Sequence, residues 1–376
     1  MKTFGDLARG HDNNFNLLRI VAALCVVAAH CMLTIGSSAE TTVDNMTGWS
    51  RTAADLALDL FFAFSGFLLT ASLVKNQNLV RYWVARLLRM IPGLLLVSAL
   101  LMFVVGPAMT TLSLGDYFAD LRVWEVPFRM AVVFDSSATL PGVFGTGTVP
   151  AAINMPIWTL RYEIVLYIAL CCVFLLGLLN GKNRFGAFLL ISIAAYFFGT
   201  LASDIRANGD FFDHIFHFGI SFVIGAAFWT YRAHVPHHWS MLIALWSVVW
   251  LVRPFAIFEF CSIVAASYSF FFIAFLPWSV LRRYNRFGDY SYGTYIMHWP
   301  VAQCYFASNP EMNSVLLTGL TMATTLPLAI LSWRYLEGPA LSRVERASVL
   351  AERSLEGLGR RIGLRQSHLT PASEPR

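Results

Sequence analysis

The first apolar segment of the chain, NNFNLLRIVAALCVVAAHCMLTIG, contains an arginine and a histidine, Arg19 and His30. They are separated by 11 helical steps of about 100°, which come within about 20° of three full turns. The two side chains therefore share one helix face, about 16 Å apart along the axis. One face would carry a fixed cation and, deeper in, a group that can transfer protons. The alternatives are an arginine that snorkels to the interface and a histidine that is only hydrogen-bonded in the core.

Other polar residues interrupt the next two apolar stretches. Asp59 and Ser65 lie in ALDLFFAFSGFLL, where Asp59 could pair with a buried cation or be a satisfied polar residue near the outer end. Arg86 and Arg89, in VRYWVARLLRMIPG, are three residues apart and therefore lie on one side of a helix. Such a pair suits a phosphate or pyrophosphate, although ordinary anchoring at the cytoplasmic surface would also explain it.

Two later segments add further candidates. MPIWTLRYEIVLYI contains Arg161 and Glu163, and an intramembrane glutamate needs a partner. Either Arg161 or His30 could supply it, and a His30–Glu163 pair would orient an imidazole base. GDYSYGTYIMHWP contains Tyr292 and His298 at roughly helical spacing, where His298 is either part of the site or a structural hydrogen-bonding residue.

The elements that must position these residues are membrane helices. The 376 residues are 57% hydrophobic and only 13% charged, whereas soluble domains have about 25% charged residues. A span needs roughly 20 apolar residues, which predicts an all-α polytopic membrane protein with about ten transmembrane helices. The expected spans lie near 15–35, 54–74, 90–110, 156–179, 186–203, 214–231, 239–256, 260–280, 290–308 and 314–336.

The distribution of charge predicts the orientation. If the N-terminus is inside, 20 of the 27 lysines and arginines fall in the inner segments, so both termini are expected in the cytoplasm. The basic residues form short clusters between apolar runs and no single stripe, which argues against a nucleic-acid partner. The six cysteines lack the spacing of a metal or redox site, so no metal is expected.

Two stretches lie outside the expected spans. The 111–155 connection is long for a loop without a role, and it could be an interfacial lid, a substrate-facing element or a structural cap. Residues 341–376 are expected to form a basic cytoplasmic tail, with a short amphipathic helix followed by a disordered end, which suits the anionic inner leaflet. The predicted division is thus a transmembrane domain over 1–340 and this tail.

Taken in order, these stretches resemble the acyltransferase 3 family of membrane-bound O-acyltransferases, from about residue 13 to 340. Each motif is short, and it is their number and order that make the resemblance specific. The matching elements are the arginine and histidine of the first span (Arg19, His30), an FF-x-x-SGF-like element (Phe61 to Phe67, preceded by Asp59), an R-x-x-R element followed by IP (Arg86, Arg89, Ile91, Pro92), W-[ST]-L-x-x-E (Trp158, Thr159, Leu160, Glu163), S-Y-x-x-Y-x-x-H-x-P (Ser291, Tyr292, Tyr295, His298, Pro300) and Y-x-E-x-P (Tyr335, Glu337, Pro339).

The resemblance implies transfer of an acyl group, acetyl or succinyl first, from a cytoplasmic coenzyme A thioester to a hydroxyl of a cell-surface or exported glycan. It implies a multi-pass protein of the bacterial plasma (inner) membrane, with acyl-CoA as co-substrate and no permanently bound cofactor. The expected partners are acyl-CoA, a glycan or glycolipid acceptor and the lipid bilayer, and a homo-oligomer is allowed. The chain looks like the stand-alone form, without the fused SGNH domain of many relatives.

On this reading, the phosphates of acyl-CoA dock on Arg86 and Arg89, with Arg19 close to the pyrophosphate. His30 acts as general base on the acceptor hydroxyl or as a transient acyl carrier, and Glu163 orients its imidazole. The supporting residues are Asp59, Ser65, Arg161, Tyr292 and His298. The alternative from another class is a secondary transporter or flippase, in which Arg19, His30, Asp59 and Glu163 form a proton relay or anion site. A purely structural or sensory membrane protein is a further alternative.

Overall fold

The computed structural model of the protein describes residues 1–8, 13–36, 52–145, 151–205, 210–277 and 282–361. These residues form helices joined by loops, without a β-strand among them. The long helices, in chain order, are α2 (Phe15–Thr34), α4 (Ala53–Asn76), α5 (Leu79–Leu100), α9 (Trp158–Leu175), α10 (Lys182–Ile205), α11 (Asp210–Thr230), α12 (Trp239–Leu251), α13 (Phe258–Ala274), α15 (Ser291–Ser308) and α16 (Ser314–Ser332).

Shorter helices extend or connect the long ones, and one longer amphipathic helix, α18, follows them. They are α1 (Phe4–Leu7), α6 (Gly106–Met109), α7 (Leu114–Ala119), α8 (Leu121–Phe128), α17 (Gly338–Ser342) and α18 (Val344–Arg361). The structure also describes five turns of other helical types. The 3₁₀ turns are η4 (Met155–Ile157) and η5 (Arg283–Arg286), and the π-helical turns are η2 (Leu101–Val105), η3 (Arg129–Val133) and η6 (Trp333–Glu337).

The structure confirms an all-α polytopic membrane protein. Each of the ten ranges expected to span the membrane overlaps one long helix, although α5 begins at Leu79, 11 residues before the expected start of its span. Among the described residues, seven helical segments are long and apolar enough to cross a membrane, and α12 and α13 are shorter apolar helices. α15 is the least apolar of the ten in its sequence, because it carries buried polar residues such as Ser291, Thr294, His298 and Gln303. The number of crossings and the side of each terminus stay predictions.

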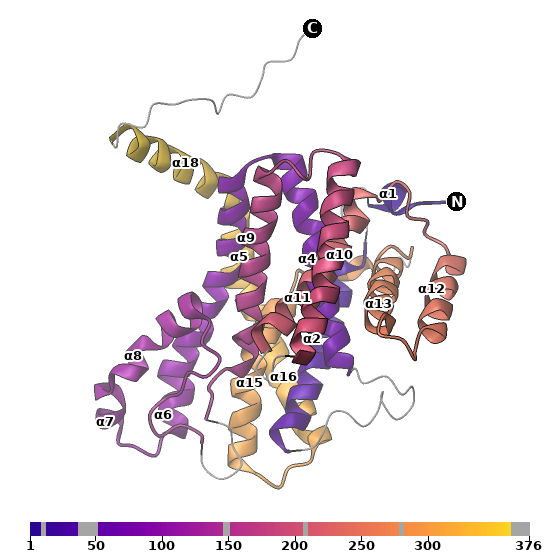
Figure 1. The fold of residues 1–376 in the computed structure, drawn as a ribbon. Helices are drawn as coiled ribbons and strands as arrows, with labels where there is room; N and C mark the ends of the chain where they lie inside the picture. Colours follow the sequence, from indigo (N-terminus) through magenta and orange to yellow (C-terminus); the bar gives the residue numbers. More distant parts are fainter. Residues whose placement is uncertain (9–12, 37–51, 146–150, 206–209, 278–281, 362–376) are drawn as a thin grey trace.

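Figure 1 shows the long helices side by side, with α1 and α18 at one end of the bundle and α6 to α8 at the other. α18 is held to α5, since Glu345 pairs with Arg81 at 2.6 Å and Glu352 accepts a hydrogen bond from Asn78. The first part of the predicted tail is therefore a helix packed on the bundle. Residues 362–376, the rest of that tail, lie outside the described residues.

α4 and α11 approach each other closely through two glycines. A Cβ added to Gly66 would lie 1.9 Å from the carbonyl oxygen of Phe222, and one added to Gly225 would lie 1.9 Å from that of Ala63. Only glycine allows the two backbones to pack at this distance. α4 itself begins with a capping box, in which Thr52 and Asp55 satisfy each other's backbone N–H groups.

The loop expected over 111–155 folds back on the bundle, apart from residues 146–150, which lie outside the described residues. Tyr117 donates a hydrogen bond to the carbonyl of Met102, which fixes α7 against η2, the π-helical turn that follows α5. At the other end of the loop, the carbonyl of Ala152 accepts a bond from the indole of Trp299, and the amide of Asn154 donates one to the carbonyl of Ile296. The loop thus contacts α15 at its middle.

Candidate functional site

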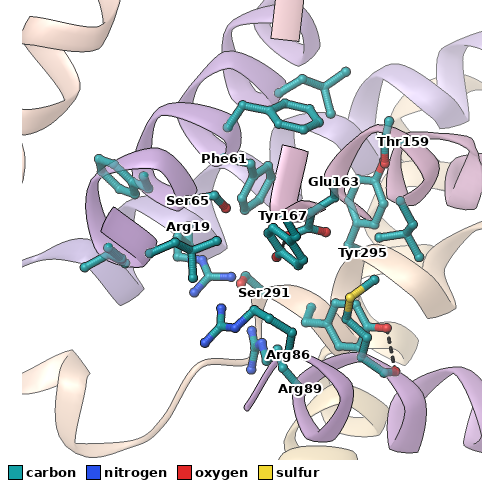
Figure 2. A pocket seen from close by; sticks show the side chains of 18 residues that line it. Arg19, Phe61, Ser65, Arg86, Arg89, Thr159, Glu163, Tyr167, Ser291 and Tyr295 are labelled. Atoms are coloured by element: carbon teal, nitrogen blue, oxygen red, sulfur yellow. Dashed lines mark hydrogen bonds between the residues drawn. The ribbon is translucent and has the colours of Figure 1, made fainter. Parts of the chain in front are cut away.

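A cavity lies between α2, α4, α5, α9 and α15 (Figure 2). The α4 residues that line it recur every three or four positions, as one face of a helix must. This face runs from Leu58 to Leu69, which corresponds to about 16 Å along the axis. The cavity therefore has two separate ends, and different residues occupy each end.

Three arginines occupy the end nearer to Leu69. Figure 2 shows the guanidiniums of Arg19, Arg86 and Arg89 gathered there, away from Thr159 and Tyr295. Arg19 and Arg89 both contact one carboxylate oxygen of Asp289, at 2.5 and 2.7 Å. Burial alone raises the pKa of the Asp289 carboxyl, but these two guanidiniums and the Ser291 hydrogen bonds hold it below its usual value.

Arg86 and Arg89 differ in their partners. Arg89 also faces the buried carboxylate of Glu337 at 3.7 Å, and its guanidinium lies over the rings of Tyr292 and Trp333. Arg86 makes no ion pair with the residues that the structure describes, and its buried Nε has no hydrogen-bond partner there. Arg86 is therefore the cation of this cluster that is most available to a ligand.

The middle of the cavity is less strongly charged. Tyr167 donates a short hydrogen bond to Glu163, and both side chains line the cavity, as does Ser65. The guanidinium of Arg86 lies 5.9 Å from the centre of the Tyr167 ring. Glu163 therefore faces the cavity, and its hydrogen-bond partner, Tyr167, lies one turn later on the same helix, α9.

Aromatic and apolar side chains form the opposite end. Phe61 and Tyr295 line it together with Leu58, and their rings are 6.2 Å apart. The Tyr295 hydroxyl is held by the Thr159 hydroxyl at 2.8 Å and the Pro156 carbonyl at 3.0 Å. Because both partners are buried, the ring of Tyr295 is fixed in this wall.

A pair of histidines lies behind this wall. Nδ1 of His30, on α2, is 2.8 Å from Nε2 of His298, on α15, and the two rings meet edge to edge, within 9° of parallel and with their centres 5.1 Å apart. The Tyr295 ring is 6.1 Å from that of His298, so the pair adjoins the aromatic end of the cavity. Trp299 packs its ring against His30 at 5.6 Å. The other ring nitrogen of His298 faces the backbone carbonyl of Tyr295 at 2.7 Å.

The structure gives His30 a different partner from the expected one. The sequence favoured Glu163, but His298 occupies that place and Glu163 bonds to Tyr167. The reason is the parallel packing of α2 and α15, which brings His298 to the level of His30.

Besides His298, two supporting residues lie outside the cavity lining. Asp59 is fully buried and contacts His217 Nε2 at 2.8 Å and Ser221 at 2.9 Å, both on α11. Its partner is thus a histidine, and none of the three cavity arginines. Arg161 is exposed on the side of α9 away from the cavity. Tyr292, in contrast, lines the cavity and donates a hydrogen bond to the Met90 carbonyl.

Sequence reasoning missed Asp289 as the centre of the arginine cluster. The signal was present, because an acidic residue stands two positions before the SYGTYIMHWP stretch that carries Tyr292 and His298. It also missed the Asp59 partners, His217 and Ser221, which lie four residues apart on one face of α11.

The sequence around this site matches a known protein family. The family model described as an acyltransferase domain matches residues 12–334, which includes the cavity and both histidines. The chain belongs to the acyltransferase 3 family. Curated relatives agree with that. Nodulation protein 10 of Rhizobium leguminosarum bv. viciae is 29% identical, over 92% of this chain and 96% of its own length.

A second relative of this acyltransferase 3 protein carries a chemical name. The O-acetyl transferase of Shigella phage Sf6 is 26% identical, over 88% of this chain and 97% of its own length. No solved structure matches the chain. Together, the family and these relatives identify a membrane O-acyltransferase, and the cavity with its adjoining histidine pair is its candidate active site.

Proposed function

We propose that this acyltransferase 3 protein moves an acyl group, acetyl or succinyl, from cytoplasmic acyl-CoA to a hydroxyl of a cell-surface or exported glycan, in the inner membrane of a bacterium. The observation that carries the proposal is the order of chemistry along the cavity. It begins with three arginines, continues past neutral side chains and Glu163, and ends at an aromatic wall beside two histidines. The parts of acyl-CoA follow a matching order. Its phosphates would meet the arginines, its thin pantetheine arm would follow the middle of the cavity, and its thioester would lie at the aromatic end beside the histidines.

Arg86 supplies the first contact with the nucleotide phosphates. Its guanidinium lines the cavity and makes no ion pair with the described residues, so a phosphate need not displace a carboxylate from it. Arg19 and Arg89 add positive potential, although each already contacts Asp289. The pantetheine arm then follows the α4 face past Ser65 towards Phe61.

His30 serves as the general base. It takes the proton of the acceptor hydroxyl while the hydroxyl oxygen bonds to the thioester carbonyl carbon. The carbon–sulfur bond then breaks and the proton passes to the sulfur, which gives an ester and the free coenzyme A thiol. The tyrosine wall at Tyr295 stands between the cavity and the histidines, so the thioester must reach past it, beside Phe61, for the reaction.

The test uses purified full-length protein in nanodiscs with radiolabelled acetyl-CoA and succinyl-CoA, and follows thiol release and label transfer to glycans extracted from the source envelope. Wild-type protein is expected to release thiol, and His30→Ala to lower the rate at least about 100-fold while the protein stays folded. Near-wild-type turnover in His30→Ala would remove the base. Mass spectrometry of envelope glycans from a deletion strain should show the loss of one acetyl or succinyl unit, which names the acceptor.

The same preparation separates an enzyme from a transporter. Thioester cleavage without an ion gradient supports the acyltransferase. Gradient-driven solute uptake into proteoliposomes, with no cleavage of either thioester, would instead support a transporter that uses Arg19, His30, Asp59 and Glu163 as a relay.

A further inference from the structure

The hydrogen bonds around His298 determine where its protons are. This residue is fully buried, and its Nδ1 lies 2.7 Å from the Tyr295 carbonyl and 3.2 Å from that of Thr294. A carbonyl oxygen only accepts hydrogen bonds, so Nδ1 of His298 must carry a proton. In a neutral ring, the Nε2 atom of His298 then has a lone pair and no proton.

The hydrogen bond to His298 in turn determines which nitrogen of His30 carries the proton. Its Nδ1 lies 2.8 Å from the Nε2 atom of His298, and that atom can only accept. Nδ1 of His30 must therefore carry the proton, which leaves the lone pair on its Nε2 atom. Two positive charges on adjacent, largely buried rings would repel each other strongly, so the pair is consistent with this neutral chain of donors and acceptors.

We infer that His298 is a positioning residue that holds His30 as the Nδ1–H tautomer, with Nε2 as the basic nitrogen. The inference rests on the proposed function, in which His30 is the base. When Nε2 takes the acceptor proton, the Nδ1–H of the resulting imidazolium keeps its bond to His298. A neutral partner binds that cation less strongly than a carboxylate would, so His30 can return the proton to the departing sulfur.

The neighbouring residues keep His298 in register. Pro300 has no N–H and cannot bond to the carbonyl of Ile296, one turn earlier. The amide of Asn154 takes that place at 2.8 Å, and the Ala152 carbonyl holds the Trp299 indole at 2.9 Å. The end of the long loop thus fixes α15 on both sides of His298. Through these two contacts the loop sets the position of His298, although it does not contact His298 or His30 by either bond.

Two substitutions separate the positioning role from simple packing. His298→Leu removes the acceptor for His30, whereas the side-chain oxygen of His298→Gln can still accept from the His30 Nδ1–H group. His298→Leu is expected to lower kcat about 10- to 100-fold and leave KM for acetyl-CoA within twofold, as loss of a histidine's orienting partner does at metal sites. His298→Gln is expected to recover at least a third of wild-type kcat.

The tautomer is measured directly by ¹⁵N NMR of the full chain in nanodiscs, labelled at histidine, with the His30 signals assigned from His30→Gln. Wild type and His298→Gln are expected to show His30 protonated at Nδ1, and His298→Leu to show the commoner Nε2–H form. This readout needs no turnover, so it stays decisive if the protein cleaves no acyl-CoA and the proposed function fails. An Nε2–H tautomer in wild type would overturn the inference. Wild-type kcat in a folded His298→Leu, or equal kcat in the Leu and Gln variants, would also overturn it.

Discussion

The arginines of the cavity have separate roles, because their surroundings differ. Arg89 is enclosed by Asp289, Glu337 and two aromatic rings, so it contributes to holding α5, the start of α15 and the η6 turn together. Arg86 lacks an ion pair among the described residues and faces the cavity. The two residues are three positions apart in one motif, yet one is mainly structural and the other is available to a ligand.

We predict that Arg86→Ala raises KM for acetyl-CoA about 10- to 100-fold, the effect of losing a hydrogen bond to a charged group. The melting temperature should stay within about 2 °C of wild type, because no buried carboxylate loses its partner. Initial rates against acetyl-CoA concentration and thermal unfolding in nanodiscs measure both. An unchanged KM in Arg86→Ala would contradict the docking role.

We predict the reverse for Arg89→Ala. It leaves the buried carboxylates of Asp289 and Glu337 with less counter-charge, which should cost about 3–5 kcal/mol of stability. Thermal unfolding measures the loss. The control is Arg81→Ala, which removes an ion pair to Glu345 whose side chains are 42% and 70% exposed, and which should cost less than about 1 kcal/mol. Equal melting temperatures in Arg89→Ala and Arg81→Ala would contradict this assignment.

Part of the candidate site could be predicted from the residues alone. The helical spacing of Arg19 and His30 placed them on one face, and in the structure they belong to one site, with Arg19 in the cavity and His30 behind its aromatic end. The partner of His30 could not be predicted. The sequence favoured Glu163, and the choice of His298 depends on which helices pack against α2, which the spacing along one helix does not determine.

At the scale of the helices, α4 and α11 cross with their backbones in close contact. The crossing depends on Gly66 and Gly225, each of which faces a carbonyl oxygen where a side chain would stand. Phe62 and Phe218 stack beside this crossing at 4.3 Å, and Phe62 also lines the cavity. The crossing therefore sets the position of one cavity wall.

We predict that Gly66→Ala and Gly225→Ala each destabilise the protein by about 1–3 kcal/mol or more, because a methyl group must push the helices apart. Both should also lower activity through the shift of Phe62. Gly319→Ala is the matched control: this glycine of α16 has open space around it, and alanine is the better helix former. Thermal unfolding compares the three. A Gly66→Ala variant as stable as Gly319→Ala would show that the crossing is not tight.

The positions of the helices followed from hydrophobic length, but several of their details did not. The start of α4 at Ala53 and the end of α2 at Thr34 fall within a few residues of the expected bounds. The π-helical turns η2 and η6 were not expected, although each is followed by a Gly–Pro pair, Gly106–Pro107 and Gly338–Pro339. A proline lacks the N–H that would continue the regular hydrogen-bond ladder of the helix. This missing donor is the physical cause of the local change of register in the π-helical turns.

At the scale of the whole molecule, the predicted orientation puts both termini on one side of the membrane. α1 and α18 lie at the same end of the bundle, and α6 to α8 at the opposite end (Figure 1). Arg86 and Arg89 of the cavity lie on α5, whose basic end at Arg81 pairs with Glu345 of α18. This arrangement suits a donor that enters from the side of α1 and α18.

We predict that green fluorescent protein fused after Arg376 fluoresces in a bacterial host, and that alkaline phosphatase fused after Leu112, in the exposed turn before α7, is active. The physical reason is that most lysines and arginines then lie in the cytoplasm. Phosphatase after Arg376 and fluorescent protein after Leu112 are the reciprocal controls. A phosphatase that is active after Arg376 would reverse the assigned orientation.

The ion pair between Arg19 and Asp289 also has a consequence for assembly during synthesis. Asp289 is translated about 270 residues after Arg19, which at about 5–20 residues per second is a delay of roughly 14–54 s. Throughout that interval α2 must sit in the bilayer with an uncompensated cation. Arg19 lies only four residues after the first residue of α2, so its side chain can reach the interfacial water while it waits. The last helices then complete the arginine cluster, so the charged end of the cavity forms only after most of the chain has been inserted.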